Sequence, residues 1–299
     1  IVAIPAQADA VVGKAVRLAQ LRHKQNADKQ VVVFFWNYPP GEKNLSASFM
    51  NLPRSLDTTL AAMRAAGYQS PVTDENRLIM TLQRLLAPFY RPAGDQAELL
   101  ALQRDGMADR LPVATYERWL GKQPKEVQAA LHERWGAPAR SSMVVRQNGA
   151  DYFIIPRLKL GNVSLLPQAP RGERWEDKEK SIYHSTSAIP SHFYLATYLW
   201  AREQAKAEAI VHYGTHGNQE WLPGKERGLS VHDYPMLAVG DVPVIYPYIV
   251  DNIGESTQAK RRGRAVIISH QTPPFAPTGL HASLTRIHDD LHAWINQDE

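Results

Sequence analysis

The chain has 299 residues, of which 44% are hydrophobic and 21% charged, a balance typical of a globular protein that can bury a sizeable core. It contains no cysteine, which excludes disulfides, thiolate zinc sites, iron–sulfur clusters and cysteine nucleophiles. The net charge of +4 suits a polycarboxylate ligand as well as nucleic acid. Because no apolar run reaches the roughly 18 residues of a membrane span and no signal peptide is recognisable, we expect a cytoplasmic protein. The chain starts at Ile1 rather than at Met, so we expect it to be an excised part of a longer chain.

The first part of the sequence predicts alternating helix and strand. Residues 8–25 carry apolar side chains at helical spacing, and residues 31–36 form the continuous β-branched and aromatic run of a buried strand. The turn residues at 37–41 end this strand, and residues 54–66 predict another helix that stops at Gly67. This order is typical of a parallel α/β layer, in which ligands bind beyond the carboxyl ends of the strands.

The rest of the chain continues this pattern around a helical insertion. Residues 71–139 predict mainly helix and contain no chemical motif, and Asn148-Gly149 predicts the turn of a β-hairpin. We expect helices at 73–87, 125–135, 191–207 and 283–294, and strands at 209–213, 244–250 and 264–269. The predicted fold is therefore α/β, with parallel-sheet layers and helices on both faces. We divide it into residues 1–155, with the insertion, and residues 156–299, with the chemical motifs.

The densest chemical signal lies at residues 212–225. His212, His216 and Glu220 recur at four-residue spacing, which on a helix would bring two imidazoles and a carboxylate onto one face as metal ligands. The intervening glycines disfavour this helix, and the preceding Ala-Ile-Val run favours a strand followed by a tight loop. A purely structural interpretation is also open, with His212 as a core residue at a strand end and Glu220 as a helix cap.

Three further polar segments have both functional and structural interpretations. Asn37 and Tyr38 follow the first buried strand, and His184 and His192 precede a helix. Residues 251–262 predict a helix with an acidic first turn and a basic last turn. A rigid turn, a helix cap and complementarity to the helix dipole would explain the three segments without any ligand.

Taken together and in order, these motifs resemble the large subunits of cobaltochelatase and magnesium chelatase. The resemblance covers the whole chain and is densest between residues 183 and 274. The segments that carry it are Asn37-Tyr38-Pro39-Pro40, Tyr183-His184, His192-x-Tyr194-Leu195-Ala196, His212-x-Gly214-x-His216-Gly217-x2-Glu220-Trp221-Leu222-Pro223-Gly224-Lys225, Gly240-Asp241-x-Pro243-x2-Tyr246-Pro247, Gly254-Glu255-x-Thr257-Gln258-Ala259-Lys260-Arg261-Arg262 and Ser269-His270-x-Thr272-Pro273-Pro274.

The resemblance implies an inner part of a much longer, ATP-dependent chelatase subunit, a ligase that forms nitrogen–metal bonds. It implies a tetrapyrrole substrate, and as partners an AAA+ ATPase subunit and an AAA-like subunit with an integrin-type domain, which hydrolyse the ATP. Residues 222–225 lack the frame of a phosphate-binding loop. Residues 258–262 and 224–225 resemble the cobalt branch, which inserts Co²⁺ into hydrogenobyrinic acid a,c-diamide in cobalamin biosynthesis; Mg²⁺ is the other metal of the family. Residues 49–55 depart from the cobalt pattern, so a CobN-like protein that acts on another macrocycle, or carries one, stays open.

The chemistry of metal insertion assigns roles to these residues. Imidazole is a good transient ligand for Co²⁺ and a carboxylate a good proton acceptor, so we expect His212 and His216 to deliver the metal and Glu220 to act as base or extra ligand. Aromatic rings would lie against the macrocycle, and basic groups would pair with its carboxylates. The expected substrate-binding residues are Asn37, Tyr38, His184, His192, Trp221, Lys225, Tyr246, Lys260, Arg261 and Arg262.

Two other classes of protein would use the same residues differently. A mononuclear zinc hydrolase would hold zinc permanently with His212, His216 and Glu220. A nucleic-acid-binding domain would use the basic residues 260–264, although no recognised binding motif accompanies them.

Overall fold

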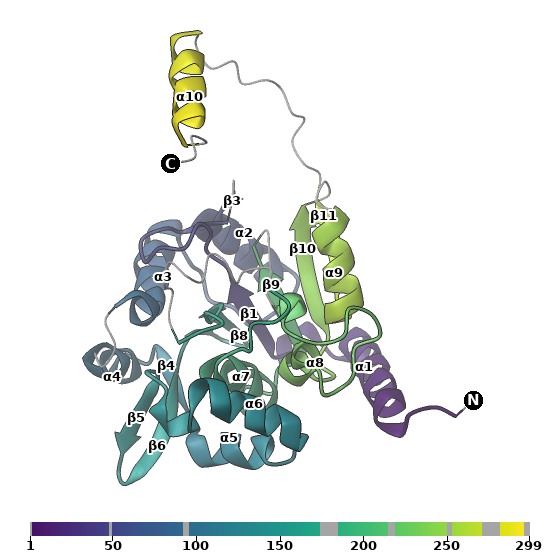
Figure 1. Ribbon diagram of the computed structural model, residues 1–299. Coiled ribbons are helices and arrows are strands. Elements are labelled where there is room, and N and C mark those ends of the chain that lie inside the picture. The colour runs from purple at the N-terminus through teal and green to yellow at the C-terminus, as the bar shows by residue number, and fades with distance from the viewer. Residues whose placement is uncertain are drawn as a thin grey trace.

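The computed structural model describes residues 2–47, 50–91, 96–173, 185–214, 219–249, 253–270 and 282–295. Its centre is a six-stranded sheet with the order β11-β10-β9-β1-β8-β7 (Figure 1). The strands are β1 (Val31–Phe35), β7 (Leu158–Leu160), β8 (Val163–Pro167), β9 (Ala209–Tyr213), β10 (Val244–Ile249) and β11 (Val266–His270). All neighbours pair in parallel except β7 and β8, so the predicted α/β fold with a parallel layer is confirmed.

Strand β1 forms the middle of this sheet because its sequence suits burial on both faces. All five of its residues are buried, as expected of a central parallel strand. It pairs with β8 on one side and with β9 on the other. Since β1 comes from the first predicted region and both neighbours come from the second, residues 1–155 and 156–299 share one sheet.

Helices cover both faces of the sheet, as predicted. The hydroxyl of Tyr213 in β9 bonds to Thr59 of α2 (Leu52–Ala65) at 2.7 Å, whereas its neighbour His212 bonds to Tyr198 of α7 (His192–Leu199) at 3.0 Å. Successive strand residues point to opposite faces, so α2 and α7 lie on opposite sides. Helix α7 continues into a π-helical segment, η4 (Trp200–Gln204), and α8 (Tyr234–Val239) and α9 (Ile253–Gly263) follow β9 and β10.

The insertion between β1 and β8 is largely helical but also contains a strand that the sequence did not predict. Strand β4 (Ala108–Pro112) pairs with β6 (Ala150–Pro156), which forms the expected hairpin with β5 (Val144–Gln147). Asn148 and Gly149 have φ values of 50° and 79°, the left-handed conformation that this two-residue turn requires. The remaining elements are α3 (Glu75–Tyr90), α4 (Gln96–Arg104), α5 (Val113–Leu120), α6 (Lys125–Trp135), the 3₁₀ turns η1 (Asn26–Asp28) and η2 (Pro138–Arg140), and the short strands β2 (Ser46–Ala47) and β3 (Met50–Asn51).

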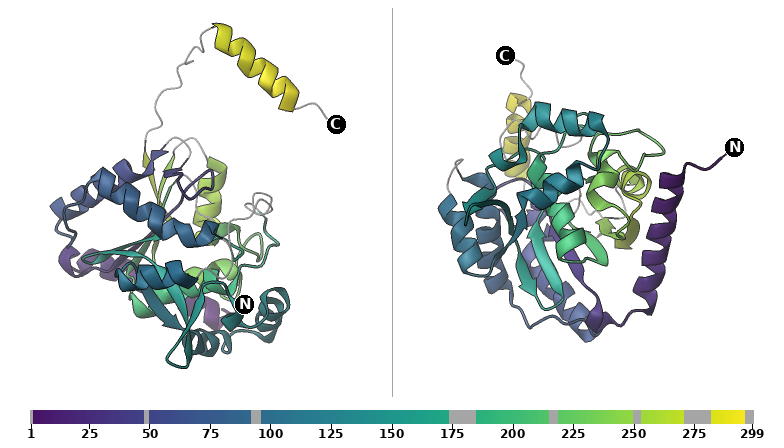
Figure 2. Two further views of the ribbon diagram at one scale, coloured as in Figure 1. Left: turned by 90° about the vertical axis from the view of Figure 1, so that its left-hand side faces the viewer. Right: turned by 90° about the horizontal axis from the view of Figure 1, so that it is seen from below.

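Two terminal helices expose apolar side chains. Helix α1 (Pro5–His23) runs along the outside of the molecule (Figure 2) and exposes Val11, Val12 and Val16. Helix α10 (Ala282–Ile295) exposes Leu284, Ile287, Leu291 and Trp294. Within the described residues, none of the helices combines the length and apolarity that crossing a membrane requires.

Truncating one buried side chain of the central strand tests the architecture. Phe34 in β1 is buried and stacks on Tyr198 of α7 with ring centroids 4.6 Å apart. We expect Phe34→Ala to lower the free energy of unfolding by about 3–5 kcal/mol, through lost burial and the cavity left behind. Val12→Ala on the exposed face of α1 is the control and should change it by less than about 0.5 kcal/mol. Denaturant titration measures both, and similar losses for the two variants would contradict this fold.

Candidate functional site

The candidate site lies where the order of the parallel strands reverses. When the five parallel strands are numbered 1 to 5 along the chain (β1, β8, β9, β10, β11), their order across the sheet is 2-1-3-4-5. The connection from β8 to β9 therefore passes over β1. In doubly wound sheets ligands bind at such a switch point, outside the carboxyl ends of the two strands beside it. Here those strands are β1 and β9, in which Phe34 lies opposite His212. The backbone N–H of Trp36 extends the pairing by donating to the carbonyl of Tyr213 at 2.9 Å.

His212 points from β9 into a buried polar cluster and is 1% exposed. The hydroxyl of Tyr198 donates to Gln168 Oε1 at 3.1 Å and lies 3.0 Å from His212 Nε2. Because that hydroxyl proton is used by Gln168, the oxygen accepts a hydrogen bond from Nε2–H of His212. The lone pair of the imidazole therefore lies on Nδ1, which has no hydrogen-bond partner among the described residues.

Burial also fixes the charge of this imidazole. Desolvation, with a smaller contribution from the positive charge of Lys14, lowers the pKa of His212 to about 3. The ring is thus neutral at any pH near 7. A neutral imidazole with a free lone pair can coordinate a divalent metal ion, whereas a protonated one cannot.

Glu220 lies in the 3₁₀ turn η5 (Gln219–Trp221) and is fully buried. The hydroxyl of Tyr246 in β10 bonds to its two carboxyl oxygens at 2.9 and 3.1 Å. Burial raises the pKa of this carboxyl to about 7, even though the hydrogen bond from Tyr246 opposes the shift. A carboxyl group with a pKa near neutrality can both accept and release a proton under working conditions.

Tyr246 connects the histidine to the carboxylate. Its ring meets that of His212 edge to face with centroids 5.1 Å apart, and its hydroxyl bonds to Glu220. His212 and Glu220 therefore converge on one side chain, although they come from different elements of the fold. Tyr246 is itself completely buried, so it does not present the exposed ring face that we expected for ligand stacking.

Arg262 holds the loop that carries Glu220. The sequence predicted an accessible, substrate-binding side chain here, but the side chain is buried. It is 2% exposed and donates to the carbonyls of Glu220 and Leu222, both at 2.6 Å, and to that of Lys225. Gly224 lets this loop close tightly: its φ is +155°, and a Cβ there would lie 2.7 Å from Cβ of Asp233. All three bonds of Arg262 hold backbone, so the position of Glu220 depends on α9.

The other predicted site residues fall into three groups. His184 and His216 lie outside the described residues. His192 is buried away from the pair, because Tyr116 and the carbonyl of Gly136 occupy its two ring nitrogens at 2.9 and 3.0 Å. Asn37 is also buried, and its amide nitrogen bonds within its own loop and to Tyr90. The side chains that remain accessible are Tyr38, Lys225, Lys260 and Arg261, with Trp221 partly buried.

No motif in the sequence marks the residues that orient His212. Gln168 follows β8 directly, so the rule that polar groups gather beyond strand ends would have pointed to it. Tyr198 had no such signal, because it lies in an apolar helix among other aromatic residues. For metal binding, no cluster of three or more His, Asp or Glu side chains suited to hold an ion exists within the part of the chain that is described.

Comparisons with known proteins agree on one family. The family model described as CobN/Magnesium Chelatase matches residues 1–299. An uncharacterised protein of Methanocaldococcus jannaschii is 35% identical over 99% of this chain and 24% of its own length. The aerobic cobaltochelatase subunit CobN of Sinorhizobium sp is 34% identical over 95% and 21%, and a magnesium-chelatase subunit of Rhodobacter capsulatus is 31% identical over 96% and 22%.

Among solved structures, the catalytic subunit of cobaltochelatase from Mycobacterium tuberculosis matches with a TM-score of 0.75 and 33% identity. The match covers 98% of this chain and 24% of that one. The chain thus spans a quarter or less of the length of the proteins it matches.

The raised pKa of Glu220 predicts a pH-dependent effect of Glu220→Gln on stability. At pH values between 4.5, the ordinary pKa of this carboxyl group, and about 7, its pKa in the folded protein, the folded protein binds the carboxyl proton more tightly than the unfolded chain does. Its contribution to stability is therefore complete below pH 4.5 and is lost as the pH rises through 7. Relative to wild type, the variant should gain up to about 3 kcal/mol over this window. Urea titrations across this range measure the difference, and a pH-independent one would contradict the raised pKa.

Proposed function

Because the chain belongs to the CobN/magnesium chelatase family, we propose that it forms part of the large subunit of a metal chelatase, which binds a tetrapyrrole and inserts a divalent metal ion. The observation that carries this proposal is that two side chains meet Tyr246 at the switch point of the sheet. They are the neutral imidazole of His212 and the carboxyl group of Glu220, whose pKa is about 7. The metal ion is a substrate of this reaction.

His212 supplies a metal ligand in this mechanism. Its Nδ1 lone pair replaces one water of the incoming ion, and imidazole nitrogen suits Co²⁺ well. The hydrogen bond to Tyr198 keeps the ring in the tautomer that leaves Nδ1 available. We propose His216, four residues further along the chain, as a second ligand, and His184 as a further candidate.

Glu220 supplies the proton acceptor. Insertion of a divalent ion displaces two pyrrolic protons, and the Glu220 carboxylate takes one of them and later releases it to solvent. The second proton passes to solvent water, because an imidazole with a pKa of about 3 does not serve as a base at neutral pH.

The accessible residues supply contacts to the macrocycle. Tyr38, 39% exposed at the carboxyl end of β1, offers a ring to its face, with Trp221 beside Glu220 as a second aromatic contact. Lys225, Lys260 and Arg261 pair with its carboxylates. Arg262, Tyr246 and Asn37 act indirectly, by fixing the elements that carry these groups. His192 instead joins α7 to the helical insertion.

Within the family, we propose the cobalt reaction, with hydrogenobyrinic acid a,c-diamide as substrate in cobalamin biosynthesis. The segments at 258–262 and 224–225 support this choice. We also propose that an AAA+ ATPase and an AAA-like, integrin-domain subunit hydrolyse ATP to drive insertion. A magnesium substrate is the alternative, since relatives of both kinds match the chain.

A tetrapyrrole carrier is the second candidate, and the complete burial of His212 and Glu220 is the observation in its favour. A carrier would bind the macrocycle at its accessible residues and use the buried pair only for packing. Metal insertion that stayed unchanged after His212→Phe would favour the carrier.

Replacing Glu220, the proposed proton acceptor, tests the enzymatic function. In the complete protein reconstituted with its ATPase partners, Glu220→Gln keeps the shape of the side chain but removes the base. We expect the rate of metal insertion to fall by about 100-fold or more while tetrapyrrole affinity is retained. Glu226→Gln, an exposed carboxylate in the same loop, is the matched control and should leave the rate unchanged. Insertion at the wild-type rate in Glu220→Gln would remove Glu220 from the mechanism.

A further inference from the structure

The segment that carries Tyr38 is fastened to the helical insertion by the end of α3. We call residues 36–47, which follow β1, the Tyr38 loop. The hydroxyl of Tyr90, the last residue of α3, accepts a hydrogen bond from the backbone N–H of Gly41 at 2.9 Å and another from Nδ2 of Asn37 at 3.2 Å. One side-chain oxygen therefore holds the loop at two places.

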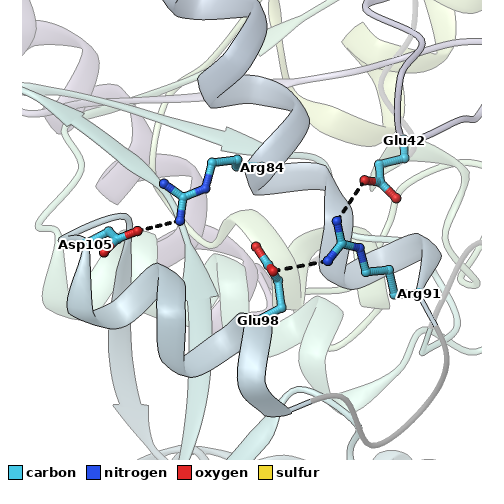
Figure 3. A network of polar contacts seen from close by, with 5 residues as sticks. All are labelled: Glu42, Arg84, Arg91, Glu98 and Asp105. Carbon is cyan, nitrogen blue, oxygen red and sulfur yellow. Dashed lines mark hydrogen bonds and ion pairs between the residues drawn. The ribbon is translucent and has the colours of Figure 1, made fainter.

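The next residue adds an ionic connection to the same loop. Arg91 pairs with Glu42 of the Tyr38 loop at 3.3 Å and with Glu98 of α4 at 3.2 Å, so that it bridges the two (Figure 3). Each pair is partly exposed and weak alone. Together with Tyr90 they join the loop to helices α3 and α4 of the insertion.

The loop itself behaves as one unit. Asn37 Nδ2 also donates to the carbonyls of Gly41 and Asn44, and the backbone N–H of Tyr38 donates to the carbonyl of Ser46 at 2.8 Å. A contact at position 41 or 42 is therefore transmitted to Tyr38.

Another side of the loop borders open space. A hollow of about 480 Å³ separates part of it from α2 and α3, and its lining includes Lys43, Ser46, Met50, Glu75 and Gln83. On this side the carbonyl of Leu45 accepts a hydrogen bond from the backbone N–H of Leu52 at 3.2 Å and β2 pairs with β3, and these contacts hold the end of the loop. The contacts with Tyr90 and Arg91 on the insertion side hold its beginning, at Asn37, Gly41 and Glu42.

We propose that Tyr90 and Arg91 are positioning residues, which hold the Tyr38 loop so that the ring of Tyr38 meets the face of the tetrapyrrole at the carboxyl edge of the sheet. This inference rests on the proposed function, because it assigns the loop to the same site. It gives the helical insertion, which carries no chemical motif, a role in macrocycle affinity. The pre-organised loop lowers the free-energy cost of macrocycle binding. It leaves the chemistry of metal insertion at His212 and Glu220 unchanged.

Binding of the macrocycle to the complete protein tests this role. The probes are hydrogenobyrinic acid a,c-diamide and protoporphyrin, titrated while the absorbance shift is followed. We expect Tyr90→Phe, which keeps the ring and removes the hydroxyl, to raise the Kd of the bound macrocycle about five- to tenfold. The insertion rate at saturating macrocycle should stay at the wild-type value. Arg91→Gln should weaken binding in the same direction by a smaller factor.

Matched variants separate positioning from a general loss of stability. Arg84→Gln removes an ion pair of the same helix, with Asp105 at 2.5 Å, that does not touch the loop (Figure 3), and it should leave Kd unchanged. In a double-mutant cycle, Tyr90→Phe should add nothing to the effect of Tyr38→Ala, because the hydroxyl acts through that ring. A general structural loss would add to it.

The remaining outcomes distinguish failure of the positioning role from failure of the proposed function. If Tyr38→Ala weakens binding and Tyr90→Phe does not, the positioning role is overturned and the proposed function stands. If Tyr38→Ala has no effect while wild type binds and inserts metal, the loop does not contact the macrocycle and the inference again fails alone. If wild type binds neither macrocycle, the proposed function falls as well.

Discussion

The structure depends on the pairing of β1 with β8 and β9. This strand comes from the N-terminal part of the chain, yet both of its neighbours come from beyond the helical insertion. The pairing closes a loop of well over a hundred residues, and the buried side chains of β1 offset the entropy of that closure. It creates the reversal in strand order and brings the Tyr38 loop, Gln168 and His212 to one edge. Without this pairing the candidate site would consist of separate segments.

Burial then determines the chemistry of that edge. His212 and Glu220 are both removed from water, but desolvation moves their pKa values in opposite directions, to about 3 and about 7. The base loses its charged form and the acid keeps its proton to higher pH, so the two neutral forms coexist in one cluster. In the proposed reaction this separation divides the roles: the imidazole is the metal ligand and the carboxyl group is the proton acceptor. The same residues on a solvated loop would carry ordinary charges and no such division.

Much of the fold could be predicted from the sequence because local patterns were strong. The buried run of β1, the strand at Ala209–Tyr213, the helix at Lys125–Trp135 and the Asn148-Gly149 turn were all predicted correctly. Strand β4 was missed because it contains charged residues and because its pairing with β6 is long-range. The choice of strand over helix for His212 was correct. The loop expected after it lies mostly at residues 215–218, outside the described residues. The contacts of Tyr246 and Arg262 could not be predicted, since an aromatic or basic residue in a motif suggests a ligand whether its partner is substrate or backbone.

The charges around the buried pair favour brief rather than permanent metal binding. Lys14 contributes a positive potential at His212, and the Arg262 guanidinium lies against the Glu220 backbone. At Glu220 itself the negative charge of Glu255 outweighs the positive charge of Arg171. Each of these cations opposes a divalent ion in a region of low dielectric. The carboxyl group that would attract the ion is partly protonated near neutrality, and this weakens its hold further. A fixed zinc centre needs the reverse arrangement, with deprotonated ligands and few neighbouring cations. The electrostatics therefore suit a site that receives a metal ion and releases it to the macrocycle.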